Sequence, residues 1–143
     1  MSDYQVALHR LFSLADYERM VGLSAFPAKV DLGRMETLVE RLGHPQRSAP
    51  VVHIAGTKGK GSTAAMVTSV LQAAGYRVGL FTSPHLHTFR ERIRVGLEPV
   101  TEGEFAALVE GLWPHVQELA SHGDMVTTFE LLVAMALKHF HEQ

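Results

Sequence analysis

Residues 51–63 read VVHIAGTKGKGST, and this stretch joins a short apolar run to a loop rich in glycine. Residues 51–55 have the composition of a short buried strand, with His53 as their one polar side chain. The eight residues that follow contain three glycines, two lysines and three hydroxyl side chains. Because apolar residues at helical spacing come next, the sequence predicts a strand, a tight loop and a helix in succession.

The loop has the chemistry of a phosphate cradle. Its glycines lack a Cβ, so they can adopt positive φ angles that turn successive N–H groups into one concavity. The N-terminus of the next helix adds partial positive charge to such a site. Lys60 can reach terminal phosphates, and Ser62 or Thr63 offers a hydroxyl to phosphate or Mg²⁺. We therefore predict a nucleotide site in which Lys60 has the catalytic role.

The spacing of the loop differs from the standard P-loop, G-x-x-x-x-G-K-[ST]. Ile54 stands where the first glycine would be, and Gly61 separates Lys60 from the hydroxyl residues. The pattern is specific for phosphate and says nothing about the reaction, and its alternative is a glycine-rich turn without a ligand. The predicted ATP-binding residues are Gly56, Thr57, Lys58, Gly59, Lys60, Gly61, Ser62 and Thr63.

Composition and charge narrow the class of protein. The chain has 143 residues, which suits one domain, and its formal net charge of −2 gives no indication of binding to nucleic acid or to an anionic membrane. The sequence has no run of about 20 apolar residues and no signal-peptide core at its start. It has no cysteine, which excludes disulfides and thiolate metal sites. We expect a cytoplasmic protein.

Apolar periodicity around the loop predicts a β–α–β unit. Residues 51–55 and 78–81 read as two buried strands, and the helix between them starts near Ser62 and ends at Gly75. Two strands joined in this way should be parallel, with a right-handed crossover. The predicted fold class is α/β, with a P-loop-type, mostly parallel sheet and flanking helices. The apolar residues of the connecting helix are Ala65, Met66, Val70 and Leu71.

The rest of the chain reads as helices and one further strand. Amphipathic helices are expected near residues 4–12 and 32–42. Residues 90–95 alternate three arginines with other side chains, which is strand periodicity. The T-x-x-E patterns at residues 101–104 and 127–130 are capping boxes that should open two helices.

Several polar residues after the second predicted strand are candidates for binding. Ser83 and His85 follow residues 78–81 at the usual ligand side of an open α/β sheet, although loop capping is an equal alternative. The arginines of residues 90–95 could hold a carboxylate or phosphate through bidentate hydrogen bonds. Their alternative is a solvated edge strand. These arginines are Arg90, Arg92 and Arg94.

Five segments of the sequence together resemble one family of ligases. Residues 56–63, GTKGKGST, are similar to the ATP loop of the Mur ligase superfamily, in the version of folylpolyglutamate synthase and dihydrofolate synthase. Residues 74–86, AGYRVGLFTSPHL, resemble that family's next helix, strand and loop. Residues 89–95, FRERIRV, match its F-x-E-R-I-R-V segment. Residues 31–35, DLGRM, and 128–130, TFE, are similar to further family positions.

The resemblance implies an ATP-dependent amide ligase with ATP and Mg²⁺ as cofactors. A carboxylate of folate or dihydropteroate attacks the γ-phosphate to give an acyl phosphate and ADP, and the amine of L-glutamate then displaces phosphate. Lys58 departs from the family, in which asparagine is commoner at that place. Three interpretations stay open beside the folate ligase. They are another Mur-type amino-acid ligase, a P-loop NTPase, which the inserted Gly61 disfavours, and a non-catalytic nucleotide-binding module.

The resemblance also implies residue roles outside the loop and an incomplete domain. Ser83 is implied as a Mg²⁺ ligand, and the pteroate or folate substrate is implied beside Lys29, Val30, Asp31, Thr127, Thr128, Phe129 and Glu130. Residues 1–143 correspond to the N-terminal portion of the ATP-binding domain, so further metal ligands and a glutamate-ligase C-terminal domain would follow. We expect this portion to be inactive alone and the full-length enzyme to be a monomer.

Overall fold

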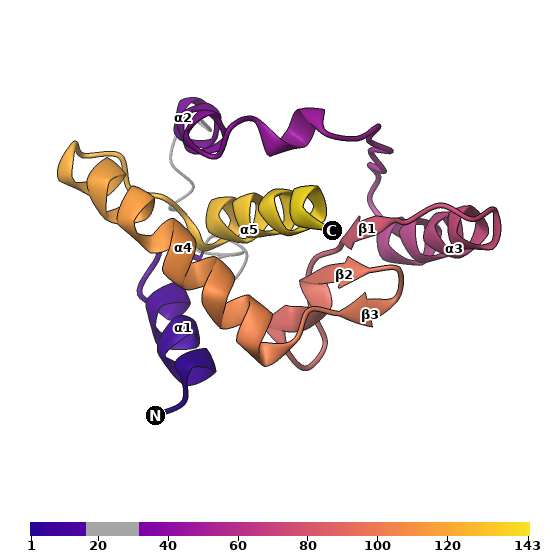
Figure 1. The fold of residues 1–143 in the computed structure, drawn as a ribbon, viewed down its shortest axis with the longest axis horizontal. Coiled ribbons are helices and arrows are strands. Elements are labelled where there is room, and N and C mark those ends of the chain that lie inside the picture. The colour runs from indigo at the N-terminus through magenta and orange to yellow at the C-terminus, as the bar shows by residue number, and fades with distance from the viewer. Residues whose placement is uncertain (17–31) are drawn as a thin grey trace.

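The computed structural model describes residues 1–16 and 32–143, so the predicted substrate residues Lys29, Val30 and Asp31 lie outside the described residues. Figure 1 shows the arrangement of the elements. The helices are α1 (Asp3–Phe12), α2 (Gly33–Arg41), α3 (Lys60–Ala73), α4 (Glu102–Ser121) and α5 (Thr128–Glu142), with the short 3₁₀ helices η1 (Pro45–Arg47) and η2 (Phe89–Arg92). The strands are β1 (Gly79–Phe81), β2 (Ile93–Val95) and β3 (Glu98–Pro99).

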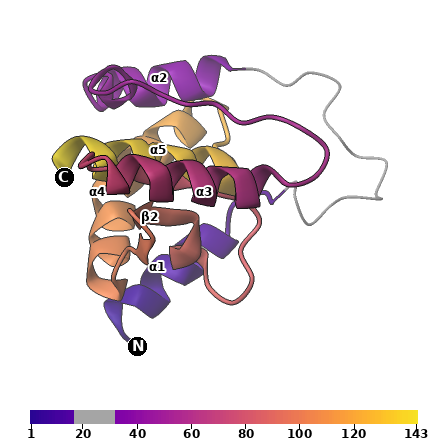
Figure 2. The same cartoon turned by 90° about the vertical axis from the view of Figure 1, so that its right-hand side faces the viewer.

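The core lies where α4 and α5 meet. α1 packs against α4 on one side of α5, and α2 lies on the opposite side of α5 (Figures 1 and 2). Both predicted capping boxes are confirmed: the side chain of Thr101 accepts the N–H of Glu104, and that of Thr127 accepts the N–H of Glu130. The largest fully buried side chains are Phe105, Leu11, Leu38, Ile93, Leu112, Leu131, Leu132, Met135 and Val109.

The α/β fold class is confirmed, but the pairing of the strands is not parallel. The described sheet has the order β1–β2–β3, and both of its ladders are antiparallel. Residues 51–55 form no strand, and Val51 and Val52 are 73% and 64% exposed. A strand needs a neighbour for its backbone N–H and C=O groups, and among the described residues no backbone hydrogen bond or strand pairing involves residues 51–55. The predicted strand therefore remains an extended, exposed segment.

The predicted strand at residues 90–95 forms only in its second half. Residues 89–92 are the 3₁₀ helix η2, and β2 begins at Ile93. The cause is a further capping box, in which the side chains of Thr88 and Glu91 bind each other's backbone N–H groups. This box turns the chain before it can pair with β1.

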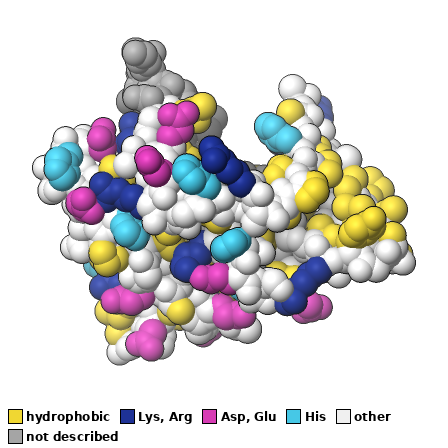
Figure 3. All heavy atoms as spheres, turned by 45° about the horizontal axis from the view of Figure 1, so that its top comes forward, with side chains coloured by type: hydrophobic (Ala, Val, Ile, Leu, Met, Phe, Trp, Pro, Cys, Tyr) yellow, Lys and Arg dark blue, Asp and Glu magenta, His cyan; other side chains and the backbone are white. Residues whose placement is uncertain are grey.

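Helix α3 stands at one end of the molecule (Figures 1 and 2). The helix is confirmed, but it begins at Lys60, and its Met66 and Val70 are exposed whereas Thr68 is buried. Figure 3 shows hydrophobic side chains gathered over this end of the molecule. Over the described part of the chain, the helices are too short or too polar to cross a membrane.

Candidate functional site

The glycine loop is open to solvent and leads directly into α3. All eight residues from 56 to 63 are exposed. Gly56 and Gly59 have φ angles of 153° and 75°, a region that favours glycine, and Gly59 caps the helix. Lys60 follows as the first helical residue, and its Nζ donates to the carbonyl of Gly56 at 2.7 Å. The loop thus presents the unpaired N–H groups of a helix N-terminus beside a lysine ammonium.

A cavity of about 190 Å³ separates the start of α3 from the loop that follows β1. Gly61 and Ala65 line it from the helix, and Thr82 and Ser83 line it from the loop. The opposite wall contains Glu91 and Arg94. The structure therefore brings the predicted ATP loop and the predicted Mg²⁺ ligand to two walls of one cavity.

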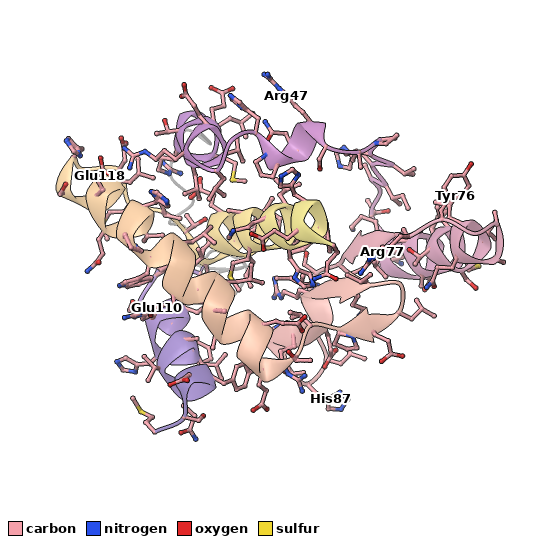
Figure 4. The ribbon with its side chains drawn as sticks, in the orientation of Figure 1. Arg47, Tyr76, Arg77, His87, Glu110 and Glu118 are labelled. Atoms are coloured by element: carbon pink, nitrogen blue, oxygen red, sulfur yellow. The ribbon has the colours of Figure 1, made fainter. Side chains whose placement is uncertain are left out.

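Glu91 fixes the shape of the loop beyond Ser83. Its carboxylate accepts the backbone N–H groups of Leu86, His87 and Thr88 at 3.0, 2.9 and 2.8 Å. These bonds, above all those from Leu86 and Thr88, lower the pKa of Glu91 from 4.5 to about 2, because they favour the ionised carboxylate. The side chain of His87 points away from the molecule (Figure 4), although its Nδ1 lies 3.7 Å from Oε1 of Glu91.

The three arginines of residues 90–95 have different surroundings. Arg92 is buried, and its Nε donates to Nδ1 of His85 at 2.9 Å. Arg90 donates from Nη1 to the carbonyl of Val100 at 3.2 Å. Arg94 donates from Nε to the carbonyl of Glu91 at 2.7 Å. The alternative of a solvated edge strand is wrong, because β2 lies between β1 and β3 in the described sheet and none of the three arginines is fully exposed.

The residues around Ser83 fit a Mg²⁺ ion that is held mainly by other oxygens. Within residues 1–16 and 32–143, no group of three His, Asp or Glu side chains could hold a metal ion. Mg²⁺ usually keeps several waters and takes one or two protein oxygens beside substrate phosphates. The hydroxyl of Ser83 lines an open cavity next to the phosphate loop, which suits this kind of coordination.

The second predicted substrate segment lies at the N-terminus of α5. Thr127 and Glu130 form the capping box, and Thr128 is buried with its hydroxyl donating to the carbonyl of Leu11 at 3.3 Å. Phe129 is 42% exposed, and its ring meets that of Phe81 edge to face at 5.9 Å between centroids. Of these four predicted residues, Phe129 is the one that offers an open surface.

Two residues important to the site were missed from the sequence. Arg34 forms an ion pair with Glu130, which is 96 positions away, and no local pattern indicates such a contact. The capping role of Glu91 could have been found from the sequence, because residues 88–91 repeat the T-x-x-E pattern that precedes the two long helices. That pattern was hidden inside an apparent strand.

Comparisons with known proteins agree in sequence and in fold. No family model matches the chain. A dihydrofolate synthase/folylpolyglutamate synthase of Bacillus subtilis is 47% identical over 122 residues, which are 85% of this chain and 28% of that protein. A crystal structure of folylpolyglutamate synthase from Thermotoga maritima has a TM-score of 0.84 at 36% identity, over 97% of this chain and 30% of that one. An FPGS–AMPPCP–folate complex has a TM-score of 0.84 at 30% identity, over 97% of this chain and 32% of that one.

This chain thus spans 28 to 32% of the length of these three relatives. The agreement covers 85 to 97% of this chain's own length. The chain belongs to the folylpolyglutamate synthase and dihydrofolate synthase family.

Proposed function

We propose that residues 1–143 supply the ATP-binding loop and part of the acceptor site of an ATP-dependent ligase. The ligase adds L-glutamate to a carboxylate of folate or dihydropteroate. The observation that carries this proposal is the cavity whose walls hold both the start of α3 and Ser83. The names of the relatives and the AMPPCP and folate of one solved complex support it. In this proposal, residues 1–143 are the N-terminal portion of the ATP-binding domain.

The proposed reaction has two steps. An oxygen of the acceptor carboxylate attacks the γ-phosphorus of ATP, the bond to the β-phosphate oxygen breaks, and ADP leaves. The amine nitrogen of glutamate then attacks the acyl carbon of the acyl phosphate, phosphate leaves, and the nitrogen loses a proton as the amide forms. Both steps develop negative charge on phosphate oxygens, so catalysis depends on positioned positive groups.

The residues of this chain bind and orient the phosphates in the first step. The unpaired N–H groups in the first turn of α3 point outward from the helix N-terminus, where they donate to phosphate oxygens. Lys60 exchanges the carbonyl of Gly56 for an oxygen of the terminal phosphate. Ser83 contributes its hydroxyl to Mg²⁺, which when bound neutralises phosphate charge. Phe129 offers an exposed aromatic face to the pteroate ring.

An assay of the complete protein with omitted substrates tests this function. The protein is incubated with ATP and Mg²⁺, with and without L-glutamate and with and without folate or dihydropteroate, and ADP is measured. A ligase forms stoichiometric ADP and amide only when both other substrates are present. ADP formation without them would indicate an NTPase, and nucleotide binding without ADP would indicate a non-catalytic module. We further propose that the complete enzyme is cytoplasmic and monomeric. Light scattering after size-exclusion chromatography tests whether it is a monomer.

A further inference from the structure

We propose that Arg94 binds an anionic oxygen group of a substrate in the cavity between α3 and the loop after β1. The group is either the terminal phosphate of the nucleotide or the carboxylate that receives it. This inference rests on the proposed function, since it assigns to Arg94 a contact with the two reacting groups of the first step.

The structure distinguishes Arg94 from the two other arginines of its segment. The guanidinium group of Arg92 is buried against the ring of Phe89, at 5.3 Å from its centroid, and binds His85. That of Arg90 binds the carbonyl of Val100 and lies over the ring of Tyr4 at 6.0 Å. Neither arginine lines the cavity, whereas Arg94 does.

The register of the sheet turns Arg94 toward the phosphate loop. Arg94 lies opposite Leu80 in the ladder of β1 and β2, so the two side chains share one face of the sheet. Leu80 and Arg94 both line the cavity, and the first turns of α3 form its other wall through Gly61 and Ala65. The face that carries Arg94 is therefore the face toward the start of α3.

The contacts of Arg94 hold its stem and leave its terminal nitrogens available. Its Nε binds the carbonyl of Glu91 at 2.7 Å. Across the described ranges, Nη1 and Nη2 of Arg94 form no hydrogen bond or ion pair. A guanidinium fixed at one nitrogen presents its other N–H groups in a planar fork, which matches two oxygens of phosphate or carboxylate.

The acidic residue of the same cavity does not neutralise the positive charge of Arg94. Glu91 also lines the cavity, but its carboxylate already accepts three backbone N–H groups. Its charge is therefore matched by the dipoles of its own loop. Thr82 and Ser83 also line the cavity, so its lining combines one cation with two hydroxyl-bearing residues.

Calorimetric binding of ADP and AMPPCP to the complete protein tests the assignment. Arg94→Gln keeps an N–H group for the carbonyl of Glu91 and removes the charge, whereas Arg94→Lys keeps the charge and removes the fork. If the anion is the terminal phosphate, Arg94→Gln should weaken AMPPCP binding about tenfold or more and leave ADP binding unchanged. The AMPPCP affinity of Arg94→Lys should lie between those of Arg94→Gln and the unaltered protein. If the anion is the carboxylate, nucleotide binding should stay unchanged and the KM of folate or dihydropteroate should rise by a similar factor.

Arg90→Gln is the matched control, because it neutralises an arginine of the same segment outside the cavity. It should change neither nucleotide binding nor the KM values, and the Tm of every variant shows whether it is folded. Equal loss of ADP and AMPPCP binding in Arg94→Gln, or no change in any of these quantities, would overturn the assignment.

The unaltered protein separates this assignment from the proposed function. If it binds AMPPCP and ADP but lacks the ligase reaction, the proposed function fails, and the comparison of nucleotide affinities still decides whether Arg94 contacts the terminal phosphate. If the unaltered protein binds neither nucleotide, both proposals fail.

Discussion

Arg34 and Glu130 connect α2 to the N-terminus of α5 through an ion pair with two donor nitrogens. Nη2 of Arg34 lies 3.1 Å and Nε lies 3.3 Å from Oε1 of Glu130. Oε2 of the same carboxylate accepts the N–H of Thr127 at 2.7 Å. The carboxylate of Glu130 thus serves both the ion pair and the helix cap, and the exposed Phe129 lies between Glu130 and the cap residue Thr127 in the sequence.

We expect Arg34→Ala to lower the free energy of unfolding by about 1–3 kcal/mol. This range lies between the values for exposed and for buried ion pairs, because the two side chains are 24% and 14% exposed. The KM of folate or dihydropteroate should rise while that of ATP stays constant, since the pair supports Phe129. Urea titration and initial rates measure the two effects, and Arg47→Ala, an exposed arginine of η1 (Figure 4), is the control. A lower stability with unchanged KM values would restrict the pair to a structural role.

Lys60→Ala should reduce turnover of the complete enzyme by about 10²–10³-fold, as the loss of one charge-stabilising group typically does. The fold should be preserved, because the Lys60 ammonium is exposed and binds a carbonyl of its own loop. The measurements are kcat and Tm, and Lys58→Ala removes a neighbouring charge as a comparison. Near-normal turnover in a folded Lys60→Ala variant would contradict the catalytic role.

Ser83→Ala should raise the Mg²⁺ concentration that gives half-maximal ligase activity. The reason is the loss of one of the few protein oxygens that such an ion takes. A Mg²⁺ titration of the rate at saturating ATP measures the shift, and Thr82→Val is a control for the neighbouring hydroxyl. An unchanged titration together with a lower Tm would favour loop capping as the role of Ser83.

The hydrogen bonds of Glu91 predict a dependence of stability on pH. The folded-state pKa of about 2 lies below the ordinary value of 4.5, so the ionised carboxylate stabilises the folded protein. This stability is fully present above pH 4.5 and is lost as the pH falls toward 2.

The difference in unfolding free energy between the unaltered protein and Glu91→Gln should therefore be constant from roughly pH 5 to pH 8. It should shrink below pH 4.5. Chemical denaturation at several pH values measures it, and Glu98→Gln, an exposed carboxylate of β3, should leave the profile unchanged. A difference that stays constant down to pH 3 or below would refute the role of the three N–H groups.

Residues 1–143 produced alone should self-associate as their concentration rises. Five large apolar side chains of residues 51–76 are between 62 and 73% exposed, and exposed apolar surface of this kind drives association. Light scattering measures the effect, and Met66→Gln combined with Val70→Gln should reduce it. A monomer at every concentration would show that this surface is tolerated in water. The five side chains are Val51, Val52, Met66, Val70 and Tyr76.

Local patterns predicted the starts of α4 and α5 correctly, whereas contacts between distant segments decided what the sequence missed. The capping boxes at Thr101 and Thr127 use residues three positions apart, so the sequence contains the whole interaction. The same holds for the positive φ of Gly59. The strand at residues 51–55 depends on a neighbour that apolar composition cannot supply. The sequence likewise could not predict which side of α3 is buried, because that depends on the part of the fold against which the helix packs.

The edge-to-face contact of Phe81 and Phe129 has a thermodynamic consequence for the affinities of the two proposed substrates. Phe81 ends β1 two residues before Ser83, and Phe129 lies in the first turn of α5. A nucleotide that displaces the end of β1 also displaces the ring that packs on Phe129. Linkage is reciprocal, so any factor by which nucleotide changes acceptor affinity is the factor by which acceptor changes nucleotide affinity. In the proposed enzyme, the contact of Phe81 and Phe129 would therefore couple the two binding sites if nucleotide binding moves the end of β1.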